Sequence, residues 1–361
     1  MLAGYGWHGR VLYMPHETEK RDIKAMLPEE IAADFKALGL PGYRAGQVFR
    51  WLGRGVTGFD QMSDLPKTLR ESLKELYFIP TLTMLKKQES ALDGTIKFLW
   101  QLSDGESVET VFMRYKHGNS VCISSQVGCR MGCAFCASTI GGKVRDLTAS
   151  EILEEVLRTQ IEAGAEISNI VLMGIGEPLD NFDNVLRFLR LVNHPEGMNI
   201  GMRHISLSTC GVVDGIDKLA EYNLQLTLSV SLHAPDDETR SKLMPVNRRY
   251  DVESLYSACE RYFRKTGRRI SFEYAMVRDT NDTPYHAKLL AQRLAGTGAH
   301  VNLIRLNYVS ERGLQPSSEQ TVRNFAKSLS DNGIAVTIRR RLGSDIDAAC
   351  GQLRRGQMRH Q

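Results

Sequence analysis

Residues 120–136, SVCISSQVGCRMGCAFC, contain four of the seven cysteines of this 361-residue chain. Three of them, Cys129, Cys133 and Cys136, follow the spacing C-x3-C-x2-C, and nearby glycines give the backbone the freedom that a tight ligand loop needs. A structural zinc site is closed by four ligands, whereas a cubane cluster held by three cysteines keeps one iron open for a further ligand. We therefore predict a 4Fe-4S cluster on this loop. A zinc knuckle that borrows a distant His or Cys, and a disulfide pair, are the alternatives.

The composition is that of a globular protein, with 42% hydrophobic and 24% charged residues. No apolar run approaches the roughly 18 residues of a membrane span, and the N-terminus lacks the pattern of an export signal. We expect a cytoplasmic protein without membrane contact. In such a protein, clustered cysteines indicate metal or catalytic chemistry rather than structural disulfides. The net charge of +4 favours an anionic partner only weakly.

The first 79 residues divide into a leader and a helical region. Residues 1–20 show no periodic pattern, so we expect a poorly ordered leader. Residues 21–79 predict three short helices, at about 28–38, 43–52 and 67–76. Arg44, Arg50 and Arg54 fall on the outer side of these helices, which favours an N-terminal helical accessory domain that binds nucleic acid. An ordinary solvated face is the alternative.

Residues 80–120 change to a strand-like period. Two β-rich runs, residues 95–102 and 108–115, are separated by an Asp-Gly turn, and another Asp-Gly turn precedes the first run. We predict a short antiparallel β lead-in, which links the helical domain to the cysteine loop or extends the next domain.

Helical and β-rich segments alternate from residue 121 to about residue 350. The helices are predicted near residues 149–163, 182–192, 215–221, 252–265, 284–294 and 318–331. The strands are predicted near residues 170–173, 204–208, 226–231, 270–274, 301–304 and 335–338. Repeated β/α units form a parallel sheet, so the predicted fold class is α/β with a full or partial (β/α) barrel over residues 121–350. Residues 351–361 are predicted to be a basic C-terminal tail.

Polar residues recur at the ends of these strands, where barrels of this kind carry their chemistry. The segment 174–178, Gly-Ile-Gly-Glu-Pro, follows the first strand, and its Glu177 is suited to an ammonium group. Ser208, the segment 231–233 (Ser-Leu-His) and Asn307 lie at later strand ends and suit ribose hydroxyls or a carboxylate. A buried, satisfied side chain is the alternative at any one position, but their common rim favours a binding site.

Two cysteines outside the cluster spacing are candidates for covalent chemistry. Cys122 lies just upstream of the loop, and Cys350 has small neighbours that leave its sulfur approachable, as a nucleophile or a carrier of a covalent intermediate requires. Cys259, inside a predicted helix, is expected to be a buried inert thiol, and the sequence leaves Cys210 undecided. Arginines 339–341 and those of the accessory domain are candidates for two sides of a phosphate-binding surface.

Together these residues resemble the dual-specificity bacterial RNA adenine-carbon-2 methyltransferases, radical S-adenosylmethionine (SAM) enzymes that act on adenine 2503 of 23S rRNA and adenine 37 of tRNA. The resemblance runs from about Asp22 to Arg354. It rests on the motifs VETV (108–111), CISSQVGC (122–129), MGIGEPL (173–179), SLHAP (231–235), LMPVN (243–247) and DAACGQ (347–352). It implies a partial barrel of the radical SAM type.

The resemblance also implies a role for each matching residue. Cys129, Cys133 and Cys136 would hold the 4Fe-4S cluster, whose open iron chelates SAM. The family's SAM contacts match Gly176, Glu177, Ser208, Ser231, Leu232, His233 and Asn307. Cys350 would be methylated by one SAM, and a second SAM would supply the radical that takes hydrogen from this methyl group. The resulting methylene radical would add to carbon 2, and Cys122 would resolve the crosslink by attacking the sulfur of Cys350, with Glu109 as a proton acceptor.

The implied partners are 23S rRNA, tRNA and an electron donor such as flavodoxin or ferredoxin, and we expect a monomer. One residue departs from the pattern: Arg305 stands where proline is expected in most carbon-2 enzymes, and it is similar to the antibiotic-resistance enzymes that methylate carbon 8 of the same adenine. Two further alternatives are a non-catalytic zinc-and-RNA-binding protein and a radical SAM enzyme for a protein or small molecule. The last gives no reason for Cys122 and Cys350.

Overall fold

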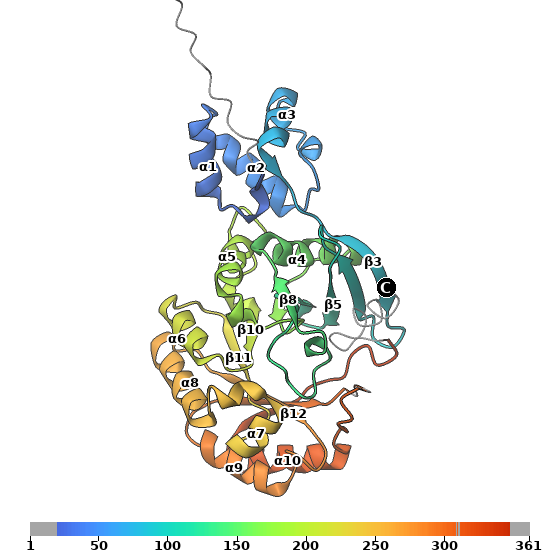
Figure 1. Cartoon of the computed structure of the whole chain (residues 1–361), viewed down its shortest axis with the longest axis vertical. Helices are drawn as coiled ribbons and strands as arrows, with labels where there is room; N and C mark the ends of the chain where they lie inside the picture. The colour runs from blue at the N-terminus through green and yellow to red at the C-terminus, as the bar shows by residue number, and fades with distance from the viewer. Residues whose placement is uncertain (1–19, 308, 310, 347–361) are drawn as a thin grey trace, which may run out of the picture.

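The computed structural model describes residues 20–307, 309 and 311–346. A helical N-terminal unit stands at one end of a larger α/β body (Figure 1). Of the predicted leader only Lys20 is described, and Cys350 and the tail 351–361 lie outside the described residues.

Within these ranges one large sheet organises the body. Its ten strands follow the order β14-β13-β12-β11-β10-β9-β6-β5-β4-β3. Strands β6 and β9 to β14 are parallel, and β5, β4 and β3 continue the sheet antiparallel. The bounds are β3 (Thr83–Glu89), β4 (Ile96–Gln101), β5 (Ser107–Tyr115), β6 (Gly118–Cys122), β9 (Asn169–Leu172), β10 (Ile205–Thr209), β11 (Thr227–Ser231), β12 (Ser271–Met276), β13 (His300–Arg305) and β14 (Ala335–Ile338). Since β14 and β3 do not pair with each other in the described residues, the barrel is open on one side, and the predicted partial (β/α) barrel is confirmed.

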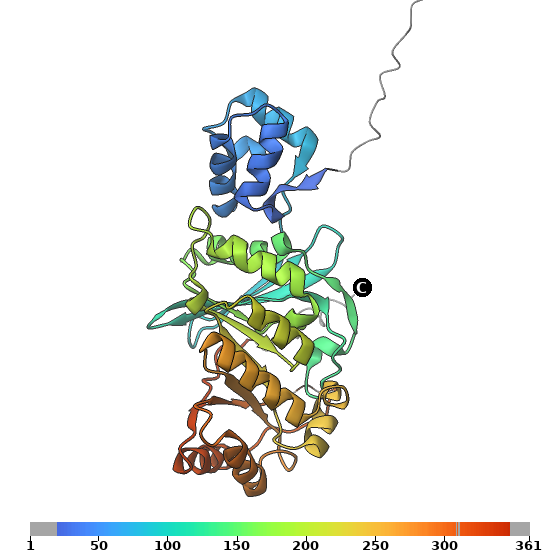
Figure 2. The ribbon, with the colours of Figure 1, turned by 90° about the vertical axis from the view of Figure 1, so that its left-hand side faces the viewer.

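Helices alternate with the parallel strands and cover the outer side of the sheet (Figures 1 and 2). They are α4 (Ala149–Ala163), α5 (Phe182–Asn193), α6 (Val213–Glu221), α7 (Asp237–Leu243), α8 (Val252–Thr266), α9 (Pro284–Leu294) and α10 (Glu319–Asp331). The sequence prediction contains six of these helices and lacks α7. That helix has only seven residues, too few to show a helical period, and begins where the Asp236 carboxylate caps the N–H of Thr239.

The antiparallel strands predicted as a lead-in belong to the same sheet. Strand β6 pairs antiparallel with β5 on one side and parallel with β9 on the other. The sheet therefore changes direction at β6, and the predicted boundary after residue 120 falls inside this strand. A small hairpin that the sequence prediction also lacks, β7 (Gln126–Gly128) and β8 (Lys143–Asp146), carries the cysteine loop. Its strands have three and four residues, which are too few to show the alternation of apolar and polar residues that identifies a strand in a sequence.

The segment after β14 crosses the open side of the barrel. The N–H of Gly343 donates to Asp93 Oδ2 at 2.9 Å. Asp345 accepts from Ser90 Oγ at 2.6 Å and from the N–H of Ala91 at 2.9 Å. The turn between β3 and β4 therefore holds the chain that leads toward the C-terminus.

The N-terminal unit contains three helices, as predicted, and is joined to α4 by buried charge. Its elements are β1 (Arg21–Asp22), α1 (Pro28–Ala37), α2 (Tyr43–Gly53), α3 (Lys67–Leu76) and β2 (Tyr77–Phe78). Lys24 Nζ lies 2.5 Å from Glu154 Oε1, and both side chains have no exposed surface. The same ammonium group lies 3.3 Å from the carbonyl oxygens of Val56 and Pro80. Arg158 Nε lies 3.3 Å from Glu154 Oε2, the other oxygen of this carboxylate. The N-terminal unit is therefore joined to α4 by a buried network of charged groups.

Replacing Lys24 with methionine is expected to lower the free energy of unfolding by about 3 kcal/mol, because a buried carboxylate loses its closest cation. Urea unfolding followed by tryptophan fluorescence measures this change. Lys327→Met is the control, since it removes an exposed ion pair with Asp331 and should cost at most about 1 kcal/mol. Equal losses in the two variants would contradict the interpretation of a stabilising buried joint.

Candidate active site

The cysteine loop is closed tightly at its base. The N–H of Cys129 donates to the carbonyl oxygen of Gly142 at 2.9 Å, and the N–H of Cys136 donates to that of Cys133 at 3.1 Å. Gly128 has φ +76°, and a Cβ atom there would lie 1.9 Å from the carbonyl oxygen of Gly142. Glycine is therefore required at this position, because the two ends of the hairpin approach too closely for a side chain.

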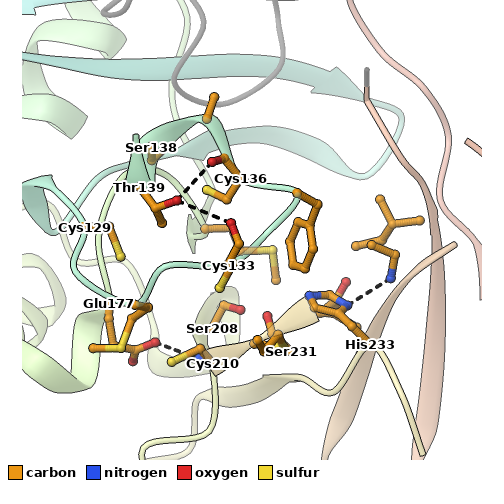
Figure 3. A pocket seen from close by; sticks show the side chains of 18 of the residues that line it. Cys129, Cys133, Cys136, Ser138, Thr139, Glu177, Ser208, Cys210, Ser231 and His233 are labelled. Carbon is orange, nitrogen blue, oxygen red and sulfur yellow. Dashed lines mark hydrogen bonds between the residues drawn. The ribbon is translucent and has the colours of Figure 1, made fainter. Parts of the chain in front are cut away.

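The three cysteines line one cavity of about 260 Å³ (Figure 3). Burial raises the pKa of Cys129 to about 12. The pKa of Cys133 is also raised, first by burial and then by the neighbouring thiols. Three thiolates gathered here need a positively charged centre to stabilise them, and thiolate ligands suit a soft metal such as iron.

The arrangement of the thiols bears on the type of metal centre. Among the residues that the structure describes, no group of three His, Cys, Asp or Glu side chains is placed to hold a single ion. In a cubane cluster each of three cysteines binds a different iron, and Cys129, Cys133 and Cys136 all line this cavity, so they suit such a cluster. Met131 and Phe135 of the loop pack in one apolar cluster with Met244, so the site has an apolar side.

The predicted SAM contacts gather at the same cavity with one exception. Its lining includes Gly176, Glu177, Ser208, Ser231, His233 and Asn307. Leu232 does not line it, because its side chain is buried in the main hydrophobic core. Its N–H donates to the carbonyl oxygen of Glu273, and its own carbonyl accepts from Arg240, so both main-chain groups are engaged.

Glu177 is a buried carboxylate held by main-chain donors. Its Oε2 accepts from the N–H of Cys210 at 2.7 Å, and its Oε1 accepts from the N–H of Leu179 at 3.0 Å. Burial raises its pKa, although these hydrogen bonds act in the opposite direction. Gly176 beside it has φ +108°, and a Cβ there would lie 2.6 Å from Gln126 Cβ. The glycine therefore lets the end of β9 pass close to the cysteine hairpin.

His233 is fixed as a neutral ring. Its Nδ1 accepts from the N–H of Ala275 at 2.9 Å, which leaves the proton on Nε2. Burial, and secondarily the charge of Arg240, lowers its pKa to about 3. The ring meets Phe135 of the cysteine loop edge to face, with centroids 4.8 Å apart. His233 can therefore donate one hydrogen bond into the cavity without carrying charge.

A second cavity of about 310 Å³ adjoins the first. It contains Cys122 and Glu109, two of the three predicted catalytic residues. Both cavities share the lining residues Met173, Gly174, Ile304, Arg305, Asn307 and Arg339. The third predicted catalytic residue, Cys350, lies outside the described residues, but Ile346 of the preceding segment lines the second cavity.

The two described catalytic candidates have different electrostatic surroundings. Glu109 forms a buried ion pair with Lys97, with Oε2 and Nζ 2.9 Å apart. Burial raises the pKa of Cys122 to about 11, although the charge of Arg339 and the N–H of Met173 favour its thiolate. Near neutral pH this thiol is therefore protonated and weakly nucleophilic.

The remaining cysteines of the described chain are not placed as nucleophiles. Cys210 lines the first cavity beside Glu177, and burial and that carboxylate raise its pKa well above the ordinary range. Cys259 is buried within α8, as predicted.

Sequence reasoning missed two polar residues of the site. Glu273 on β12 lines the first cavity and accepts from Asn302 Nδ2 at 2.8 Å. The sequence did contain a signal for Glu273, because a carboxylate within an otherwise apolar predicted strand indicates a functional position. Arg312 donates from Nη2 to the carbonyl oxygen of Cys136 at 3.2 Å and to Thr139 Oγ1 at 2.6 Å. It thereby ties the loop after β13 to the cysteine loop, and nothing in its sequence context indicates this.

Arg305 belongs to the wall that the two cavities share, and its guanidinium has a carboxylate partner. It forms an ion pair with Glu319 at the start of α10, with Nη2 and Oε1 2.9 Å apart. Arg305 lines both cavities, as its neighbour Ile304 does. The charge of Arg305 is therefore paired with Glu319 while the residue remains part of the shared wall.

Two family models match this chain, the radical SAM superfamily over residues 123–290 and the ribosomal RNA large subunit methyltransferase N-terminal domain over residues 22–79. A relative from Lachnoclostridium phytofermentans, a probable dual-specificity RNA methyltransferase RlmN, is 50% identical over 339 residues, which are 94% of this chain and 95% of that protein. The chain belongs to the RlmN family of radical SAM RNA methyltransferases. This membership confirms the predicted family and reaction class, and it implies SAM and a 4Fe-4S cluster as cofactors.

Two further comparisons agree. A probable dual-specificity RNA methyltransferase RlmN from Clostridium tetani is 52% identical and covers 87% of this chain and 90% of that protein. The crystal structure of a radical SAM methyltransferase from Sphaerobacter thermophilus has a TM-score of 0.88 at 42% identity, covering 92% of this chain and 98% of that one. The alternatives of a non-catalytic zinc protein and of an enzyme for proteins or small molecules are therefore wrong. Among the described helices none is both long and apolar enough to cross a bilayer.

Replacing Cys133 with alanine is expected to abolish cluster assembly, because a cubane then keeps two cysteine ligands. After anaerobic reconstitution, iron analysis should give about four irons per chain for the natural sequence and well below one for the variant. Cys259→Ala is the control and should retain full iron. Zinc in place of iron in the natural protein would overturn the cluster assignment.

Alkylation of Cys122 in the apoprotein is expected to be slow near neutral pH and to rise until the pH reaches about 11. Arg339→Gln removes a nearby positive charge, so it should raise the pKa further and slow alkylation at every pH below the plateau. Arg261→Gln, on the outer face of α8, should change nothing. Mass spectrometry of the Cys122 peptide after pulses of iodoacetamide measures the rates, and a plateau below pH 9 would contradict the expectation.

Proposed function

We propose that this enzyme methylates carbon 2 of adenine 2503 in 23S rRNA and of adenine 37 in tRNA, through an S-methylcysteine and a transient protein–RNA crosslink. The observation that supports the proposal is the adjoining pair of cavities. One is lined by the three cluster cysteines and the predicted SAM contacts, and the other by Cys122 and Glu109. They share a wall, so a radical precursor in one cavity and a nucleobase in the other would be neighbours.

The chemistry of the target explains why such a pair of cavities is needed. Carbon 2 of adenine is electron-poor and has no lone pair, so it cannot attack the methyl group of SAM directly. When bound, the cluster and SAM supply the hydrogen abstraction that activates an S-methyl group. Two SAM molecules serve each turnover, because one donates the methyl group and the other provides this abstraction.

We assign the covalent steps to three residues. Cys350 accepts the methyl group on sulfur, and its carbon becomes a methylene bridge to carbon 2. As the ring regains aromaticity, the adduct loses the hydrogen of carbon 2 as a proton, for which Glu109 is the acceptor, and its unpaired electron, which the bound cluster would take up. The Cys122 thiol then gives up its proton, and its sulfur attacks the sulfur of Cys350 and breaks the bond of that sulfur to the methylene carbon. That carbon takes up a proton as the new methyl group, and the resulting disulfide is reduced before the next turnover.

The RNA partners fit the basic residues around the second cavity. Arg339, Arg340 and Arg341 line it, and phosphate binding is the usual use of such arginine clusters. We further propose that the residues of 21–79 contact RNA, that a flavodoxin or ferredoxin donates the electron, and that the enzyme acts as a cytoplasmic monomer.

Methylation of carbon 8 is the second candidate, because Arg305 resembles the carbon-8 enzymes. Arg305 lines both cavities, and its guanidinium is engaged by Glu319. We favour carbon 2 because the segments 177–179 (Glu-Pro-Leu) and 232–235 (Leu-His-Ala-Pro) resemble those of the carbon-2 enzymes, and we expect Arg305→Pro to leave the position of methylation unchanged.

The test is nucleoside analysis of 23S rRNA and tRNA fragments treated with reconstituted enzyme, SAM and a reductant. We expect 2-methyladenosine as the product. Cys350→Ala should give no product, because the methyl carrier is lost, and Cys122→Ala should accumulate a covalent RNA–protein species on denaturing gels. Cys259→Ala should match the natural enzyme. The proposal fails if 8-methyladenosine is the sole product or if Cys350→Ala remains fully active.

A further inference from the structure

Arg240 of α7 is buried among main-chain carbonyl groups. Its side chain has no exposed surface, and within residues 20–307, 309 and 311–346 it forms no ion pair. Each nitrogen of the guanidinium donates instead to neutral acceptors. These are the carbonyl oxygens of Cys210 at 2.7 Å, Leu232 at 3.1 Å, Ser231 at 3.3 Å and Tyr250 at 3.5 Å, and Asn247 Oδ1 at 2.8 Å. A cation in such a place is costly unless every donor is satisfied, which indicates a specific use.

The carbonyl groups that Arg240 binds belong to two strand ends. Cys210 directly follows β10, which carries Ser208, and Ser231 ends β11, after which Leu232 leads into His233. Because β10 and β11 are parallel neighbours, their carboxyl ends reach the cavity at the same level. One planar guanidinium therefore fixes the spacing of the two strand ends that present three of the predicted SAM contacts.

The peptide of Cys210 is held from both sides. Its N–H donates to Glu177 Oε2 at 2.7 Å, and its carbonyl oxygen accepts from Arg240 Nη2 at 2.7 Å. A buried carboxylate and a buried guanidinium thus face each other across one peptide group. Arg240 is itself oriented by Asn247, whose Nδ2 lies 2.9 Å from Asp237 Oδ1.

We propose that Arg240 is a positioning residue for SAM: it holds the ends of β10 and β11, together with the Glu177-bound peptide between them, in the geometry that receives the cofactor. The inference rests on the proposed SAM contacts Ser208, Ser231 and His233. Arginine is needed because only a planar fork donates to several carbonyls in one plane, whereas the ammonium group of lysine reaches fewer of them.

The first test uses the apoprotein and needs no cofactor. Hydrogen exchange measured by mass spectrometry should show faster exchange in Arg240→Lys for the peptides covering residues 205–213 and 227–235, with the outer helices unchanged. Arg249→Lys is the control, because Arg249 lies close by in sequence but forms an exposed ion pair with Asp214. Unchanged exchange at both strand ends would overturn the proposal, as would an increase spread evenly over the whole protein.

The second test measures SAM affinity of the reconstituted enzymes at equal iron content by isothermal titration calorimetry. Arg240→Lys should bind SAM about tenfold more weakly or worse, as expected for the loss of a buried charged hydrogen bond. Arg249→Lys should bind normally, and equal affinity in both would refute the role. If Arg240→Lys fails to fold, Asn247→Ala replaces it, because this change removes the amide that orients Arg240. Asn247→Ala should show the same faster local hydrogen exchange and weaker SAM binding. Exchange rates and SAM affinity equal to those of the natural protein would count against the proposal.

These tests separate the inference from the proposed function. Failure of RNA methylation with normal SAM binding in the natural enzyme would reject the proposed reaction but leave the role of Arg240 in place. Successful RNA methylation by the natural enzyme, with unchanged hydrogen exchange and SAM affinity in Arg240→Lys, would reject the role of Arg240 but leave the proposed reaction in place.

Discussion

The site depends on the alignment of parallel strand ends at one edge of the sheet. Because β9, β10 and β11 run in the same direction, Glu177, Ser208 and Ser231 face one cavity although they are far apart in sequence. The cysteine hairpin enters this arrangement beside β9, where glycine at position 176 permits the close approach. Where the sheet turns antiparallel at β6, the same edge continues into the second cavity, so the fold itself makes the two compartments adjacent.

Buried charge is the second organising principle of this enzyme. The interior near the cysteine loop contains a carboxylate, a guanidinium and a histidine, and each has a defined set of partners. Glu177 and Arg240 are held by main-chain groups, and His233 stays neutral because it is desolvated next to that cation. A pocket in which these buried groups are already oriented would change little when an ionic cofactor enters.

Sequence patterns predicted most of this arrangement for physical reasons that can be traced to particular residues. The spacing of Cys129, Cys133 and Cys136 is local, so it is visible without a fold, and the strand-end position of Glu177 follows from the β/α alternation. Arg240 was not predictable, because in the polar segment 236–242 it resembles a solvated helix residue, and only the packing of α7 against two strand ends buries it. The role of Cys350 came from the family resemblance, since small neighbours alone do not specify a methyl carrier.

The segment that crosses the open side of the barrel has a consequence for folding kinetics. The hydrogen bond from Gly343 to Asp93 joins residues 250 positions apart, and the contacts of Asp345 with Ser90 and Ala91 have similar separations. Closing such a long loop costs chain entropy before the contacts can contribute favourable free energy, so these contacts should form late in folding. The second cavity, which Gly343, Ser344 and Ile346 line, would then be completed only after the segment following β14 has been synthesised, and a shorter nascent chain would lack this compartment.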